Sequence, residues 1–242
     1  MTTIMTTEHP DYTLYYWPVP LRGHPLRAIL SYAGANWEEG DPGQGAQIMN
    51  AAPDDQPVPF MGLPFLIDHK NDFALSQMPA IAYYLGEALG LLPDTSEGRA
   101  LCMKVNNDAN DVMDEITLQG GMLMWSDESW QAWVPNLRRW MGMWESLGKR
   151  HVLTEESGYL LGTPDPTIAD IVTATLWVTM CERFPKIGSL LKETAPCTTA
   201  LAHRMWAMPA LAKFGKDSDE SYGDSYCGGQ IEESLLEVVG GE

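Results

Sequence analysis

The 242-residue sequence predicts a small α/β domain followed by an all-helical domain. Three observations predict this fold class. Strand-like runs and the patterns of two amphipathic helices both occur within roughly the first 90 residues. No strand pattern recurs after them, and the remaining apolar residues repeat at helical spacing.

The first domain begins with a strand and a helix. Residues 12–17 (YTLYYW) are aromatic and β-branched, which is typical of a strand. The next apolar run, HPLRAILSYAG at residues 24–34, has helical spacing. Pro25 suits its first turn and Gly34 its C-terminal stop.

A loop, a hairpin and a second helix complete the first domain. Residues 39–59 are rich in Gly, Pro and Asp, which predicts irregular structure with a strand before it at Trp37 and a short helix near Gln47. PFLID and DFAL flank the turn at residues 69–71 and predict a hairpin. A helix is predicted over residues 79–90.

The second domain is predicted to be entirely helical. We place the domains at residues 10–92 and 97–214, with a linker between them, and the predicted helices at 98–124, 129–147, 167–184 and 198–208. Thr167 and Asp170 match a capping box at the start of the third of these helices, which is a structural role.

An acidic C-terminal tail is predicted for residues 215–242. It holds eight acidic residues and one lysine and so contributes −7 of the net charge of −18, a composition typical of a mobile segment. Its apolar stretch, residues 231–239, is also compatible with a docked helix.

Composition excludes several classes of partner. A net charge of −18 repels nucleic acid and anionic lipid, and no apolar run is long enough to span a bilayer. The amino terminus lacks the pattern of a secretory signal, and the four cysteines form no CxxC pair, which favours a cytoplasmic protein. The five histidines have no metal-ligand spacing, so no metal site is expected.

Several motifs follow one another in a recognisable order: YTLYYWPVPLRGHPLRAILSYAG, GLPFLID, SQMPAIAYYLGEALGLL, GTPDPTIADI and HRMWAMPALAKF. Together they resemble the cytosolic glutathione transferases, within them the tyrosine-type group that includes the pi, mu and sigma classes. The resemblance covers most of the chain. It implies a thioredoxin-like first domain, a helical-bundle second domain and a homodimer, with glutathione as co-substrate and no other cofactor.

The resemblance places the family's catalytic tyrosine at Tyr16. Only the thiolate of glutathione is a good nucleophile. A phenol that donates a hydrogen bond to the sulfur favours the thiolate, and lowering a pKa by about two units takes about 2.7 kcal/mol. The alternative role for Tyr16 is that of a strand aromatic packing beneath a helix.

The remaining glutathione contacts that the resemblance implies are Trp17, His24, Gly62, Leu63, Pro64, Gln77, Met78 and Asp111. Pro64 matches a cis-proline that lets the Leu63 backbone pair with the cysteinyl unit. Asp111 matches an acid that reaches the γ-glutamyl ammonium across the dimer interface, and it could equally be a solvated acid on a helix.

Two of these positions depart from the family pattern. Met78 stands where a serine usually helps to hold the γ-glutamyl carboxylate, and His24 stands where the pi class has an arginine. No basic residue lies between Arg27 and Lys70. We therefore expect weak glutathione affinity, or a substituted way of holding its carboxylates.

The electrophile pocket is expected between Tyr16 and the stretch TLQGGMLMW, with Thr117, Gly121, Met122 and Met124 as its residues. Methionine side chains adapt to varied apolar ligands, although they pack between helices just as readily. The predicted function is a glutathione transferase that acts on small apolar electrophiles. The alternatives are a non-catalytic binding or structural protein of the same fold, or a glutathione-dependent isomerase or lyase.

Overall fold

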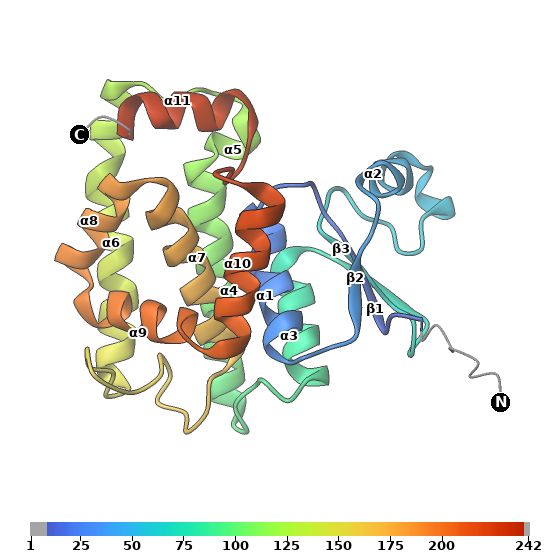
Figure 1. Cartoon of the computed structure of the whole chain (residues 1–242), viewed down its shortest axis with the longest axis horizontal. Coiled ribbons are helices and arrows are strands. Elements are labelled where there is room, and N and C mark those ends of the chain that lie inside the picture. The colour runs from blue at the N-terminus through green and yellow to red at the C-terminus, as the bar shows by residue number, and fades with distance from the viewer. Residues whose placement is uncertain (1–8, 240–242) are drawn as a thin grey trace.

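The first domain is a mixed four-stranded sheet with helices on both faces (Figure 1). The computed structural model describes residues 9–239. The strand order is β2-β1-β3-β4, in which β1 and β2 are parallel and the other pairs antiparallel. The elements are β1 Tyr12–Tyr15, α1 His24–Tyr32, β2 Trp37–Glu39, α2 Pro42–Asn50, β3 Phe65–Asp68, β4 Phe73–Ser76 and α3 Met78–Ala88, with 3-10 turns at Leu21–Gly23 and Pro53–Asp55.

The alternation of side chains along β1 continues into the next residue and separates Tyr15 from Tyr16. Tyr15 packs with Phe60 and Phe65 in a small cluster that α2 helps to cover. Leu14 and Tyr16 belong instead to the main core, together with buried residues of α1 and α3. Successive side chains of a strand point to opposite faces, so the two phenols occupy different environments.

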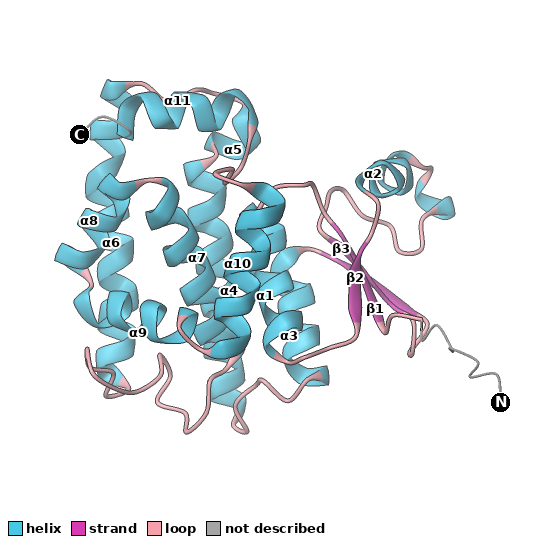
Figure 2. Cartoon of the chain, in the orientation of Figure 1, coloured by secondary structure: helices cyan, strands magenta, loops and turns pink. Residues whose placement is uncertain are grey.

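The rest of the described chain is helical (Figure 2). Its helices are α4 Ser96–Ile116, α5 Leu118–Gly121, α6 Asp127–Arg150, α7 Ile168–Arg183, α8 Pro185–Thr194, α9 Pro196–Trp206, α10 Pro209–Tyr222 and α11 Gly229–Val239. The central helix is α7, which packs against α1, α4, α8 and α9, so a single core runs through both domains. No helix within residues 9–239 has the length and apolarity needed to cross a membrane.

The predicted helix 98–124 is shorter in the structure. It ends at Ile116, and the backbone φ angles of Leu118, Gln119, Gly120 and Gly121 are 44°, 57°, 74° and 82°. This left-handed turn redirects the chain, and the two glycines adopt it without steric cost. The helix α8 lies between the predicted helices 167–184 and 198–208 and was not predicted.

The C-terminal residues are folded against the second domain, so the predicted mobility of the tail is wrong for residues 215–239. Residues up to Tyr222 continue α10, and α11 packs against α5 and α8. Ile231, Leu235 and Val239 on α11 are buried. The docked helix that the apolar stretch allowed is therefore observed, while residues 240–242 lie outside the described part.

Asp170 secures the start of α7. Its buried carboxylate accepts hydrogen bonds from the backbone N–H groups of Leu160 (2.7 Å) and Thr167 (2.8 Å) and from the Thr167 hydroxyl (2.9 Å). We expect Asp170→Ala to lower the free energy of unfolding by about 2 kcal/mol, since it removes a helix cap and leaves buried donors without an acceptor. Urea unfolding followed by tryptophan fluorescence measures this loss. Asp165→Ala is the matched control on an exposed acid, and equal loss in both variants would contradict the assigned role.

Candidate functional site

A cavity of about 510 Å3 lies where three distant segments of the chain meet. The first segment follows β1 and contributes Tyr16 and Trp17. The second is the left-handed turn after α4 and the residue Met124. The third is the chain leading into α11, from Cys227 to Ile231. Both domains and the C-terminal segment are therefore needed to form this one cavity, which we call the Tyr16 cavity.

Tyr16 lies at the wall of this cavity, and only 3% of its surface is exposed. Burial raises the pKa of its phenol, and the nearby Arg22 and Arg27 offset only part of that effect. The phenol is consequently protonated at neutral pH. Within residues 9–239 its oxygen accepts a hydrogen bond from the Arg22 N–H at 3.3 Å and donates none, which leaves its proton available to an acceptor in the cavity.

The turn after Trp17 holds Tyr16 in place. A Cβ atom on Gly23 would lie 2.4 Å from the Tyr16 ring, so only glycine fits there. The Arg22 side chain reaches across to α4, where it contacts Asn110 at 3.2 Å and Asp114 at 2.9 Å. These contacts fix the start of α1 relative to the second domain.

The C-terminal wall of the cavity is held by the buried carboxylate of Glu232. Its Oε2 accepts hydrogen bonds from three consecutive backbone N–H groups, those of Tyr226 (3.0 Å), Cys227 (2.9 Å) and Gly228 (2.6 Å). Its Oε1 accepts from Arg183 on α7 at 2.7 Å. Burial disfavours the charged carboxylate, yet these hydrogen bonds outweigh it and lower the pKa of Glu232.

The same wall contacts the first domain directly. The Leu21 N–H donates a hydrogen bond to the Tyr226 carbonyl at 3.1 Å. Cys227 faces the cavity, but burial, together with the nearby Glu232, raises the pKa of its thiol to about 12. Because only a thiolate is strongly nucleophilic, Cys227 is a neutral wall residue at neutral pH.

The predicted glutathione contacts Leu63, Pro64 and Gln77 lie at the end of the sheet where Phe65 of β3 pairs with Ser76 of β4. The Leu63–Pro64 peptide bond is cis, in agreement with the predicted geometry, and a Cβ on Gly62 would meet no atom within 4 Å. Gln77 is exposed and has a φ of 75° at the start of α3. The Met78 side chain is buried in the main core, which leaves only its backbone for a ligand.

The His24 side chain is buried and does not line the Tyr16 cavity. His24 is the first residue of α1 and packs against α10, with its ring centroid 4.7 Å from that of Phe214 and its Nε2 3.5 Å from the Ser218 hydroxyl. Burial, with Arg27 nearby, lowers the pKa of His24 to about 3. The imidazole is therefore neutral and serves the packing of α10.

Each of the three fixed cations in the described part of the first domain already has a carboxylate partner. Arg22 pairs with Asp114 at 2.9 Å and Lys70 with Asp11 at 2.6 Å. Arg27, which is almost fully buried, pairs with Glu39 and lies 4.9 Å from the Tyr222 ring centroid. Backbone N–H groups and neutral side chains are thus the donors left for an anionic ligand at this end of the sheet.

The residues predicted for the electrophile pocket divide into two pairs. Gly121 and Met124 line the Tyr16 cavity. Thr117 does not, because it is buried and its hydroxyl donates to the Met113 carbonyl at 2.8 Å as part of the α4 terminus. Met122 is 77% exposed and also lies outside the cavity, so these two assignments are corrected.

Asp111 is exposed on α4 and does not reach the Tyr16 cavity. Burial and the neighbouring acids Asp108 and Asp114 raise its pKa. Within residues 9–239 no group of three or more His, Cys, Asp or Glu side chains is arranged to hold a metal ion.

Sequence reasoning missed Gly23, Arg183 and Glu232, as well as the cavity-lining segment 227–231. The charge count flagged Glu232 only as one of many acids in the tail. The position of Glu232 depends on its contact with Arg183, which is far away in the sequence. No local sequence pattern predicts such a contact.

Comparisons with known proteins agree with this fold. Residues 101–238 match the family model described as the C-terminal domain of glutathione S-transferase. The solved structures of NaGST-2 and NaGST1 share 23% and 22% identity with this chain, with TM-scores of 0.67 and 0.68. Na-GST-3, a monomeric glutathione S-transferase from the human hookworm parasite Necator americanus, has 22% identity and a TM-score of 0.68.

Each of the three matches covers 86% of this chain and 97% of the other chain. At this level of identity the likeness shows a shared fold. No curated protein matches the sequence.

Proposed function

The chain belongs to the glutathione S-transferase family, and from this premise we propose that it is a tyrosine-type transferase in which Tyr16 activates the thiol of bound glutathione. The observation that carries the proposal is the protonated Tyr16 phenol, whose proton has no acceptor within residues 9–239 and which lies at the wall of the Tyr16 cavity. A donor in this setting stabilises a thiolate more than a thiol.

We propose that glutathione lies across the end of the sheet, with its sulfur at Tyr16. The backbone of Leu63 would pair with the cysteinyl unit. The N-terminal N–H groups of α3, next to Gln77 and Met78, would hold the γ-glutamyl carboxylate, because a helix N-terminus favours an anion. Since the three cations of this domain are paired, we expect weaker binding than in a site with a free lysine or arginine.

The electrophile would occupy the Tyr16 cavity between Trp17, Met124 and the C-terminal wall. The thiolate attacks an electrophilic carbon, a carbon–sulfur bond forms, and a leaving group such as chloride departs with the bonding electrons. The thiol proton passes to solvent. The apolar wall residues favour a small apolar electrophile, and a cavity of about 510 Å3 is large enough for a substituted aromatic ring.

A non-catalytic role is the second candidate, favoured by the buried side chain of Met78 and by the paired cations. Retention on immobilised glutathione, followed by turnover of chlorodinitrobenzene, separates the two. We expect both retention and turnover. Retention without turnover would support the binding role, and failure of both would remove the glutathione assignment.

We also propose that the protein is a cytoplasmic homodimer in which Asp111 reaches the glutathione ammonium of the partner subunit. Sedimentation analysis of the purified protein tests the dimer. In a dimer, Asp111→Asn should raise the KM for glutathione about ten- to a hundredfold, since a charged hydrogen bond contributes about 1.5 to 3 kcal/mol. In a monomer the exposed Asp111 makes no such contact, and KM would stay unchanged.

A further inference from the structure

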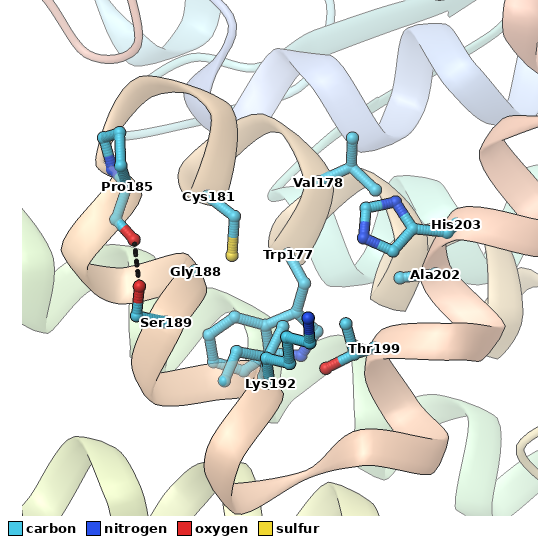
Figure 3. Close-up of a pocket in the computed structure, with 11 residues that line it drawn as sticks. Trp177, Val178, Cys181, Pro185, Gly188, Ser189, Lys192, Thr199, Ala202 and His203 are labelled. Carbon is cyan, nitrogen blue, oxygen red and sulfur yellow. Dashed lines mark hydrogen bonds between the residues drawn. The ribbon is translucent and has the colours of Figure 1, made fainter. Parts of the chain in front are cut away.

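The central helix α7 borders two cavities besides the one at Tyr16. On one side, Trp177, Val178 and Cys181 line a largely apolar cavity of about 320 Å3 between α7, α8 and α9 (Figure 3). On another side, α7 meets α1, α10 and the chain that follows α10, and a polar cavity of about 120 Å3 lies between them. We call this smaller one the α10 cavity. Among the described residues, none lines both the α10 cavity and the Tyr16 cavity.

Three carboxylates line the α10 cavity, those of Glu182 on α7, Asp219 on α10 and Asp224 after it. Within residues 9–239 none of the three has a cation within salt-bridge distance. Arg183 also lines the cavity, but its guanidinium is paired with Glu232 at 2.7 Å. Burial, with Asp219 nearby, raises the pKa of Glu182, as expected for a carboxylate close to a second one. The cavity therefore carries negative charge that the chain itself does not neutralise.

His24 on α1 adds a buried acceptor to the same cavity. Only 2% of its surface is exposed, and its Nδ1 has no hydrogen-bond partner within residues 9–239. Its imidazole is neutral, because burial lowers its pKa to about 3, so one ring nitrogen carries a proton and the other accepts. When Nε2 donates to the Ser218 hydroxyl at 3.5 Å, Nδ1 is left as an acceptor that a ligand or water must satisfy.

The spacing and size of the α10 cavity select an organic cation rather than a metal ion. Within residues 9–239 no three His, Cys, Asp or Glu side chains lie close enough together to hold one metal ion. A primary ammonium group instead offers three N–H donors to acceptors that are farther apart. A cavity of about 120 Å3 admits this group with a few methylenes but no ring system, and Trp206 supplies apolar surface for the methylenes.

We propose that the α10 cavity binds one ammonium group of a linear aliphatic amine. The ammonium lies between the carboxylates of Glu182 and Asp219 and donates to Nδ1 of His24, while the chain lies against Trp206. The net charge of −18 raises the concentration of such cations at the protein surface. Binding here does not depend on glutathione.

Occupation of the α10 cavity should also hold the C-terminal wall of the Tyr16 cavity in place. Asp224 and Ser225 line the α10 cavity, and the segment that Glu232 anchors begins with the next residue, Tyr226. A ligand that binds only the docked arrangement of this segment stabilises that arrangement. We therefore expect the amine to slow hydrogen exchange in residues 224–239.

Equilibrium dialysis with radiolabelled 1,4-diaminobutane at constant ionic strength tests the proposal. This amine is a dication at neutral pH, and we expect one saturable site per chain, for which the uncharged 1,4-butanediol does not compete. Asp219→Asn should raise the Kd about five- to tenfold, because it removes one charged contact. Asp217→Asn is the matched control: it makes the same change on the same helix, at an exposed residue that does not line the cavity. Its Kd should change less than twofold.

A further variant tests the location of the amine. Thr179 on α7 lines the α10 cavity, so Thr179→Phe should fill it and abolish binding, with circular dichroism confirming the fold. Equal losses in Asp219→Asn and Asp217→Asn, binding that survives Thr179→Phe, or unchanged exchange of residues 224–239 at saturating amine would overturn the proposal. Glutathione retention should be unchanged in Asp219→Asn, so failure of this proposal is distinguishable from failure of the transferase assignment.

Discussion

Replacing Tyr16 by phenylalanine is expected to lower kcat/KM for glutathione about a hundredfold with chlorodinitrobenzene as electrophile. The change removes one hydroxyl and keeps the ring that the close contact with Gly23 positions. Without the phenol proton the sulfur loses a hydrogen bond to its charged form, and a pKa rise of about two units is equivalent to about 2.7 kcal/mol. The pH dependence of turnover reports that pKa directly, so its midpoint should shift upward by about the same two units.

Tyr15→Phe is the matched control for this experiment. Tyr15 precedes Tyr16 in the sequence, but its side chain lies on the other face of the sheet, where the hydroxyl donates to Gln44 at 3.2 Å. We expect turnover of this variant within about twofold of the parent. If Tyr16→Phe kept parent turnover and an unchanged pH midpoint, Tyr16 would have no part in activating the thiol.

Replacing Glu232 by alanine is expected to detach the C-terminal wall of the Tyr16 cavity. The carboxylate organises the backbone from Tyr226 to Gly228 and ties it to Arg183. Hydrogen bonds to a charged group contribute about 1.5 to 3 kcal/mol each, and a loss of about 4 kcal/mol in local stability follows when these are removed together. Hydrogen exchange of the peptide covering residues 224–239 should accelerate by about three orders of magnitude, and KM for the electrophile should rise.

Glu233→Ala is the control on the exposed neighbour, which should leave both hydrogen exchange and KM unchanged. The pH dependence provides a second check. Because the folded-state pKa of Glu232 is lowered, its contribution is complete above the ordinary glutamate pKa of about 4.3 and is lost as the pH falls through the folded value. The wall should therefore stay docked from pH 5 to 8 and loosen below about pH 4. Rapid exchange at neutral pH in the parent protein would contradict the assigned role.

Local patterns in the sequence predicted much of the first domain, because its elements are short and bounded by strong signals. The strand at Tyr12, the hairpin around residues 69–71 and the helix before Gly90 all follow from side-chain periodicity and turn residues. The predicted helix 98–124 contains Gly120 and Gly121, which disfavour a helix interior and indicate a break there, but the pattern did not place the end of the helix at Ile116.

Part of the geometry of the candidate site followed from single residues: Tyr16 lines the cavity, and the Leu63–Pro64 bond is cis. Their roles toward glutathione stay predictions. His24 was misplaced because alignment gives its position in the chain but not the direction of its side chain, which α10 determines. Met122 was assigned to the pocket as an apolar residue of the predicted helix, but it follows the left-handed turn at residues 118–121 and is exposed. Electrostatic partners such as Glu232 with Arg183 bridge segments far apart in the sequence, and their pairing appears only once the helices have packed.

The Glu232 anchor also bears on the order in which the molecule assembles. The contact between Leu21 and Tyr226 joins residues that lie about 200 positions apart in the chain. Bringing them together lowers the conformational entropy of the segment between them, and this loss precedes any gain in stability from the contact. We therefore expect the Tyr16 cavity to be among the last features to form on folding. We expect ligands to reach the cavity when residues 224–239 detach locally. This local opening can become more or less frequent without any change in the stability of the sheet or of α7.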